Sequence, residues 1–195
     1  MNTRRLAIRA LAAGASVLVL NGCAPLLIGG TATGASLAAD RRPVHTVVDD
    51  AFIKLRIEAL IAAHKTLHRR THVDVTSVNG LVLLTGEAQT PADRDRVLTL
   101  ARRVPGVRRL VDQLRVAAPS SFGARLADSW VTLRVKAALI ADGLDAHITI
   151  VTAHRVVYLM GLVSPRQGNR AARAASRIPH VRSVVELFQY RHDRR

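Results

Sequence analysis

The segment DAFIKLRI at residues 50–57 returns as DSWVTLRV at residues 128–135, and this recurrence decides the fold. Further blocks match in the same order: HVDVT (72–76) with HITIV (147–151), VLLTG (82–86) with VYLMG (157–161), TP (90–91) with SP (164–165), and VPGV (104–107) with IPHV (178–181). The separation between matching blocks falls from 78 to 74 residues, as small loop changes would produce. Several matches in one order indicate an internal duplication.

Each copy begins with a stretch of helical periodicity. In the second copy Val131, Val135 and Leu139 recur every four residues, which places them on one face of a helix. The range 53–61 repeats the pattern with three isoleucines. We expect both faces to lie in a core.

Two alternating strands follow each first helix. Around residues 73–75 and 82–84, apolar side chains alternate at period two on either side of Asn79-Gly80, a strong signal for a hairpin turn. The second copy has His154-Arg155 at this point, so we expect a different turn geometry there.

A second helix and a last strand complete each copy. Thr90 and Ser164 are suitable N-caps before prolines, and Pro105 and Pro179 end the helices. A helix between the second and third strands lets those strands run parallel. We therefore predict an α+β fold with two tandem αββαβ modules, 49–117 and 128–191, joined by a linker at 118–127. Each module is expected to have a three-stranded mixed sheet with two helices on one face, and two such small modules should pack on each other.

The N-terminus is typical of an exported precursor. Three arginines precede an apolar run at residues 10–20, and small residues lead from it to Cys23. The run is shorter than the ~20 residues of a membrane-spanning helix, so we expect 1–22 to be a cleaved signal peptide. Residues 23–48, rich in Gly, Ala and Thr, are expected to be a flexible tether.

Cys23 is the single cysteine of the chain, which excludes a disulfide within a monomer. Its setting resembles the lipobox of bacterial lipoproteins, which implies diacylglycerol on the thiol and acyl chains such as palmitate. Ala24 in the next position implies delivery to the outer membrane by the same resemblance. The alternative is an incidental buried thiol.

The order of elements, the strand ends at Gly86 and Gly161 and the VPGV segment resemble the BON domain. Two such modules behind a lipobox resemble the dual-BON outer-membrane lipoproteins. The segments DSWV (128–131) and LMGLV (159–163) are the most specific. Arg155 and His180 stand where the pattern has glycine, which bears on the shape of those loops. The resemblance implies phospholipid or envelope-surface binding, a part in outer-membrane integrity and no catalysis.

The formal charge of +15, or +12 without residues 1–22, favours polyanionic partners. Arg166, Arg170, Arg173 and Arg177 are spaced to form one stripe on the second helix of the second copy. Four like charges at this spacing repel one another, and an anionic surface would relieve the repulsion. The alternative is an ordinary solvated face.

Trp130 lies beside the Val131 core face, where an indole can insert at a lipid interface. Arg134 is one turn further along and Lys136 lies near the same surface, so the three residues are candidates for lipid binding. Burial of Trp130 between the modules is the alternative, because large aromatic side chains are usually mostly buried.

Signs of catalysis are missing from the sequence. There is no Gly-rich phosphate loop, nucleophile elbow or carboxylate cluster, so we predict no enzyme activity, no catalytic residues and no cofactor. His64, His68 and His72 are four residues apart, but the run lacks a cysteine or carboxylate and straddles an expected helix end. We therefore predict no metal site there.

The leading hypothesis is an outer-membrane lipoprotein with a periplasmic folded part that binds anionic phospholipid through the basic helices of the second module. The runner-up is a protein-interaction module that docks on another envelope or peptidoglycan-associated protein. Nucleic-acid binding suits the charge, but export separates the chain from nucleic acid, and 3% aromatic residues offer few stacking platforms.

Overall fold

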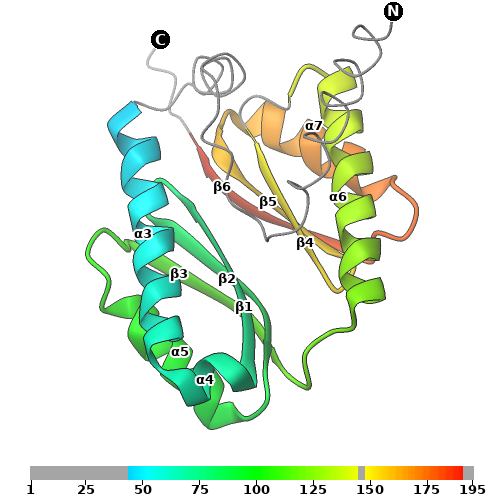
Figure 1. Cartoon of the computed structure of the whole chain (residues 1–195). Coiled ribbons are helices and arrows are strands. Elements are labelled where there is room, and N and C mark those ends of the chain that lie inside the picture. Colours follow the sequence, from blue (N-terminus) through cyan, green and yellow to red (C-terminus); the bar gives the residue numbers. More distant parts are fainter. Residues whose placement is uncertain (1–43, 145–147, 191–195) are drawn as a thin grey trace, which may run out of the picture. The chain divides into compact units, whose positions relative to one another are not determined.

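The structure is a computed structural model that describes residues 44–144 and 148–190 (Figure 1). The first module consists of α3 (Val44–Ala63), α4 (Lys65–Arg70), β1 (Thr71–Val78), β2 (Leu81–Ala88), α5 (Pro91–Arg102) and β3 (Arg109–Val116). The second consists of α6 (Phe122–Ala141), β4 (Thr149–Ala153), β5 (Val156–Val163), α7 (Pro165–Ser176) and β6 (Ser183–Tyr190). The predicted α+β fold of two repeated modules is confirmed.

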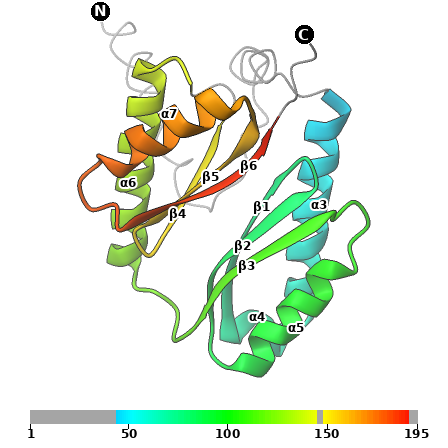
Figure 2. The ribbon, with the colours of Figure 1, turned by 180° about the vertical axis from the view of Figure 1, so that it is seen from behind.

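Both sheets have the predicted mixed topology. Their strand orders are β1-β2-β3 and β4-β5-β6, with an antiparallel first pair and a parallel second pair. The helices α5 and α7 make the crossovers that parallel pairing requires (Figure 2). The close approach of β1 to β2 requires glycine at Gly86, because a Cβ atom there would lie 2.0 Å from the carbonyl oxygen of His72.

Alternation along the central strands separates two apolar layers. Val82 and Leu84 of β2 pack with the buried faces of α3 and α5, whereas Leu81 and Leu83 belong to a different cluster. The central strand β5 divides its side chains in the same way. The expected helix faces are buried: Ile53, Ile57, Ile61, Val131, Val135 and Leu139.

The second cluster draws on both modules. It joins Leu81 and Leu83 of β2 to Val156, Tyr158 and Met160 of β5. The Tyr158 hydroxyl also donates a hydrogen bond to Oε1 of Gln113 on β3, at 3.1 Å. The contact expected between the modules therefore involves sheet faces.

Two helices begin before the first residues assigned to their modules. The helix α3 begins at Val44, inside the segment assigned to the tether, and α6 begins at Phe122, inside the assigned linker. The hydroxyl of Ser121 accepts a hydrogen bond from the backbone N–H of Ala124, so this side chain caps α6 earlier than the apolar pattern indicates. The short helix α4 was not predicted.

The expectation of a different hairpin turn in the second copy is wrong. Asn79 and Gly80 have φ values of 52° and 72°, and His154 and Arg155 have 52° and 63°. His180 likewise has a φ of 71° where Gly106 has 93°. The copies therefore keep one loop geometry although glycine has been replaced at two positions.

An aspartate of the first helix supports each turn. Asp128 accepts hydrogen bonds from the backbone N–H groups of His154 and Arg155, at 2.7 and 2.9 Å. Asp50 accepts the equivalent pair of backbone hydrogen bonds in the hairpin turn of the first module. These contacts explain why both copies carry an aspartate at this position and how His154 and Arg155 are held with positive φ.

Candidate membrane-binding surface

The helix α6 is apolar on two faces. Opposite the core face lie Phe122, Leu126, Trp130, Leu133 and Ile140, which we call the α6 stripe; all five are at least half exposed. Their spacings of four, four, three and seven residues place them on one side of the helix. Surface helices usually carry polar residues there, so the α6 stripe is a candidate contact surface.

Trp130 is 59% exposed, so the alternative of its burial between the modules does not hold. The guanidinium carbon of Arg134 lies 5.9 Å from the centroid of the indole, within the range of a cation–π contact. Lys136 is exposed on the other side of the α6 stripe. The structure thus brings an aromatic ring and cations together on one helix.

The four arginines predicted to form a stripe on α7 are all exposed. Arg170 donates a hydrogen bond to the backbone carbonyl of Asp142 at the end of α6, at 3.0 Å. Among the described residues no carboxylate forms an ion pair with Arg166, Arg170, Arg173 or Arg177. Their positive charge is therefore available to an external anion.

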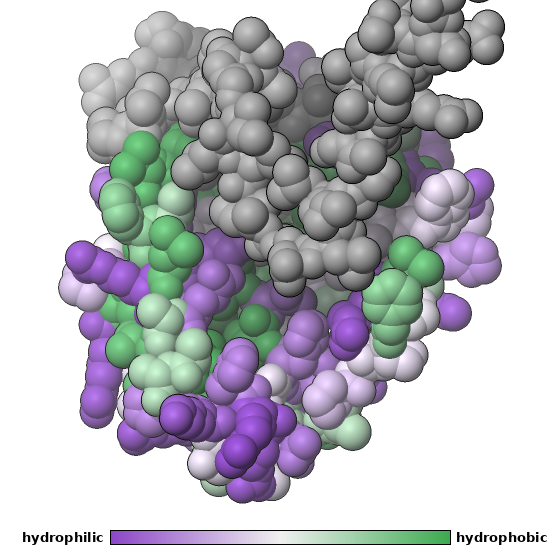
Figure 3. Space-filling model, viewed as in Figure 1, coloured by the Kyte–Doolittle hydropathy of each residue, from purple (hydrophilic) through white to green (hydrophobic). Residues whose placement is uncertain are grey.

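These features belong to one side of the second module. The helices α6 and α7 pack on the same face of their sheet through Val135, Leu139, Ala171 and Ala175, so their outer surfaces both point away from it. Figure 3 shows apolar side chains gathered along α3 and a smaller apolar patch over α6. The sequence prediction had identified Trp130 but missed the rest of the α6 stripe, although the spacing of its leucines was visible.

Among the residues the structure describes, no three His, Cys, Asp or Glu side chains are grouped so that they could hold a metal ion. The Nδ1 atom of His64, in the bend between α3 and α4, lies 2.8 Å from the carbonyl oxygen of Leu60 in α3. His72 lies on β1, 3.8 Å from Asp74. Within the same part of the chain, no helix is both long and apolar enough to cross a membrane. Cys23 lies outside the described residues.

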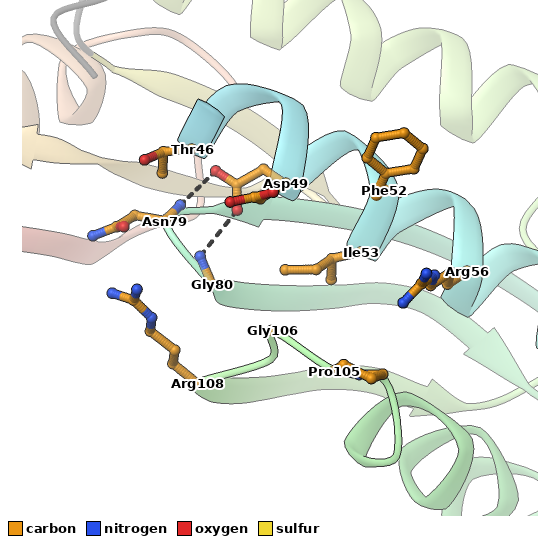
Figure 4. A pocket seen from close by; sticks show the side chains of 11 residues that line it. Thr46, Asp49, Phe52, Ile53, Arg56, Asn79, Gly80, Pro105, Gly106 and Arg108 are labelled. Carbon is orange, nitrogen blue, oxygen red and sulfur yellow. Dashed lines mark hydrogen bonds between the residues drawn. The ribbon is translucent and has the colours of Figure 1, made fainter. Parts of the chain in front are cut away.

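A pocket of about 370 Å³ lies beside the hairpin turn of the first module (Figure 4). It is lined by Asp49, Phe52, Arg56 and Arg108, among others. Asp50 at its edge accepts hydrogen bonds from the backbone N–H groups of Asn79 and Gly80, at 2.6 and 2.9 Å, and from the hydroxyl of Ser77. This carboxylate therefore has a structural role in the turn.

A second pocket, of about 340 Å³, has Ser120, His154 and Glu87 among its lining residues. The Ser120 hydroxyl donates to Oε1 of the buried Glu87, and Nε2 of His154 lies 3.1 Å from that oxygen without the alignment of a hydrogen bond. Because the hydroxyl is engaged by the carboxylate, His154 is not placed to act as its base. The arrangement differs from that of an activated nucleophile.

Comparison with known proteins agrees with this architecture. The BON domain model matches residues 49–118 and 127–192. The chain is 32% identical to the outer membrane lipoprotein DolP of Haemophilus influenzae, over 90% of this chain and 92% of that protein. It is 28% identical both to a 21 kDa hemolysin of Actinobacillus pleuropneumoniae (77% and 79% covered) and to osmotically-inducible protein Y of Escherichia coli (77% of each). The chain, with its two repeated modules, belongs to the BON domain family.

Proposed function

We propose that this protein is an outer-membrane lipoprotein whose second module binds anionic phospholipid and thereby supports the integrity of the outer membrane. The single observation that carries the proposal is the exposed α6 stripe with Arg134 and Lys136 beside it. An apolar ridge edged by cations fits the boundary between acyl chains and acidic headgroups.

The energies favour a bilayer over water. Burial of one large apolar side chain is worth roughly 1.5–3 kcal/mol, and the α6 stripe offers five. Each cation close to an anionic surface adds about 1 kcal/mol, which applies to Arg134, Lys136 and the four exposed arginines of α7. Trp130 suits the headgroup level, where indoles are enriched.

Attachment through Cys23 would raise the local concentration of lipid. The lipobox setting of this residue supports acylation at this position, as does the similarity to the outer membrane lipoprotein DolP. Two signals, acyl chains and a basic apolar surface, give firmer membrane binding than either alone. Mass spectrometry of the native protein tests the acylation, and an unmodified Cys23 thiol would contradict it.

Sedimentation with vesicles tests the role of α6. The mature chain with Cys23→Ser, which cannot be acylated, should bind vesicles containing phosphatidylglycerol and bind less as salt rises. Trp130→Glu should weaken binding at least tenfold, because it places a carboxylate at the interface. The matched control is Phe52→Glu, the same change at the equivalent position of the first module, which should bind like the parent at protein dilutions at which neither chain self-associates. Equal binding of parent and Trp130→Glu would refute the proposal.

A second set of variants tests the arginines of α7. Replacing Arg166, Arg170, Arg173 and Arg177 together by glutamine should weaken binding to anionic vesicles and flatten its dependence on salt. Arg102 and Arg103, exposed at the end of α5 in the first module, serve as the control when changed to glutamine. Binding that is insensitive to salt and to the α7 changes would favour an envelope protein as partner.

A further inference from the structure

The α6 stripe has a counterpart in the first module. Val48, Phe52 and Leu55 stand 78 residues before Leu126, Trp130 and Leu133, and all six side chains are exposed. We call the first three the α3 stripe. In Figure 4 Phe52 points away from the strands whereas Ile53 points toward them. The core face of α3 is provided by Ile53 and its helical neighbours, so the fold does not require the α3 stripe.

The charges beside the α3 stripe have both signs. Asp49 and Arg56 are seven residues apart, two helical turns, and so lie on one flank of the stripe. Both are exposed, and within the described residues neither forms an ion pair. On the other flank Glu58 lies 3.8 Å from Lys54.

The second module differs at these positions. Ala127 replaces Asp49 and Lys136 replaces Glu58, whereas Arg134 keeps the arginine found at Arg56. The α6 stripe is therefore edged by cations, whereas the α3 stripe would bring Asp49 and Glu58 toward any acidic surface. An anionic bilayer fits the first arrangement and not the second.

The α3 stripe is complementary to itself when two helices run antiparallel. Its flank has an acid toward the helix N-terminus and a base toward the C-terminus. We propose that α3 docks against α3 of a second copy of this chain, around a two-fold axis between Phe52 and Leu55. Phe52 then packs on Leu55 of the second copy, and Asp49 of each chain lies beside Arg56 of the other. Both chains use the same surface in such an isologous contact, so assembly stops at a dimer. The antiparallel arrangement of the two helix dipoles is also favourable.

Sedimentation equilibrium of the mature Cys23→Ser chain tests this proposal without lipid. The parent should form a dimer with increasing concentration, and Phe52→Glu should be monomeric over the same range. Trp130→Glu should dimerise like the parent, which separates this contact from membrane binding. Thermal unfolding followed by circular dichroism shows whether each variant is folded.

A charge exchange makes the test specific to the antiparallel register. Asp49→Arg or Arg56→Asp alone should weaken dimerisation about tenfold, since each creates two repulsive pairs, and the double exchange should restore it. A monomeric parent, equal dimerisation by Phe52→Glu, or failure of the double exchange to restore the dimer would overturn the proposal. Loss of vesicle binding in Phe52→Glu without any dimer in the parent would instead make the bilayer the occupant of the α3 stripe.

Discussion

Arg155 has a left-handed backbone, with a φ of 63°, at the tip of the β4–β5 hairpin. This conformation costs a residue with a Cβ atom about 1–2 kcal/mol, and glycine avoids the cost. The first module has Gly80 in the same place. The hydrogen bond from the Arg155 N–H to Asp128 offsets part of the difference.

Arg155→Gly should therefore raise the free energy of unfolding by roughly 0.5–1 kcal/mol, the steric relief less the added chain entropy. Chemical denaturation of parent and variant measures the change. Arg103→Gly is the control: Arg103 has an ordinary φ of −80° at the end of α5, so this variant should be no more stable than the parent. A gain at both positions would show that backbone strain is not the cause.

Asp128 is expected to matter more than its partial exposure indicates. Asp128→Ala removes the acceptor of two backbone N–H groups and should cost about 2 kcal/mol of unfolding free energy. Asp142→Ala, at an exposed aspartate that ends the same helix, should change stability by less than about 0.5 kcal/mol. Equal effects of the two changes in thermal unfolding would contradict the role assigned to the turn.

At the scale of single elements, the periodicity of the sequence predicted the core faces of α3 and α6, because burial repeats every third or fourth residue. The α6 stripe escaped prediction although it has the same spacing. The core face alone predicts a helix at this place, and apolar residues on its other side are equally compatible with a helix buried all round. Only the packing of α6 on one side of a single sheet shows which of its two apolar faces is left outside.

The two faces of α6 should respond differently to truncation. Val135 is fully buried, and Val135→Ala should lower the free energy of unfolding by roughly 2–3 kcal/mol without changing vesicle binding by the folded protein. Leu133 is 59% exposed, and Leu133→Ala should weaken vesicle binding while stability stays within about 0.5 kcal/mol. Denaturation and sedimentation of both variants check the pair; a reversed pattern would mean that the faces are misassigned.

The strand β5 carries a group that titrates at alkaline pH. Burial raises the pKa of the Tyr158 phenol above its ordinary value of 10.0, although Arg182 and Arg115 act in the opposite direction. A raised pKa in the folded state means that folding favours the neutral phenol. Stability should be unaffected below pH 10 and should fall as pH rises from there through the folded pKa.

Tyr158→Phe should therefore reduce the loss of stability above pH 10, at the expense of the hydrogen bond to Gln113 at neutral pH. Denaturant titrations from pH 8 to the alkaline limit measure both effects. An unchanged alkaline limb in Tyr158→Phe would show that another group causes the loss.

For the whole molecule, the repeated order of helices and strands was enough to predict two α+β modules, each with a mixed sheet and a parallel second pair. The first helix of each module begins before the assigned module, because an N-cap such as Ser121 can begin a helix before its apolar pattern does. The turn at His154-Arg155 was mispredicted because its support comes from Asp128, 26 residues away, and local turn propensity does not include such a contact. Cys23 remains a prediction, since it lies outside the described residues.

The cluster of Leu81, Leu83, Val156, Tyr158 and Met160 has a practical consequence for dissecting the protein. Cutting the chain near residue 120 would give two fragments, each with an apolar sheet face newly exposed to solvent. Such fragments would tend to aggregate or associate incorrectly. Their binding to liposomes would then reflect the newly exposed face rather than the native activity. Single substitutions in the intact chain are therefore the better way to assign a function to each module.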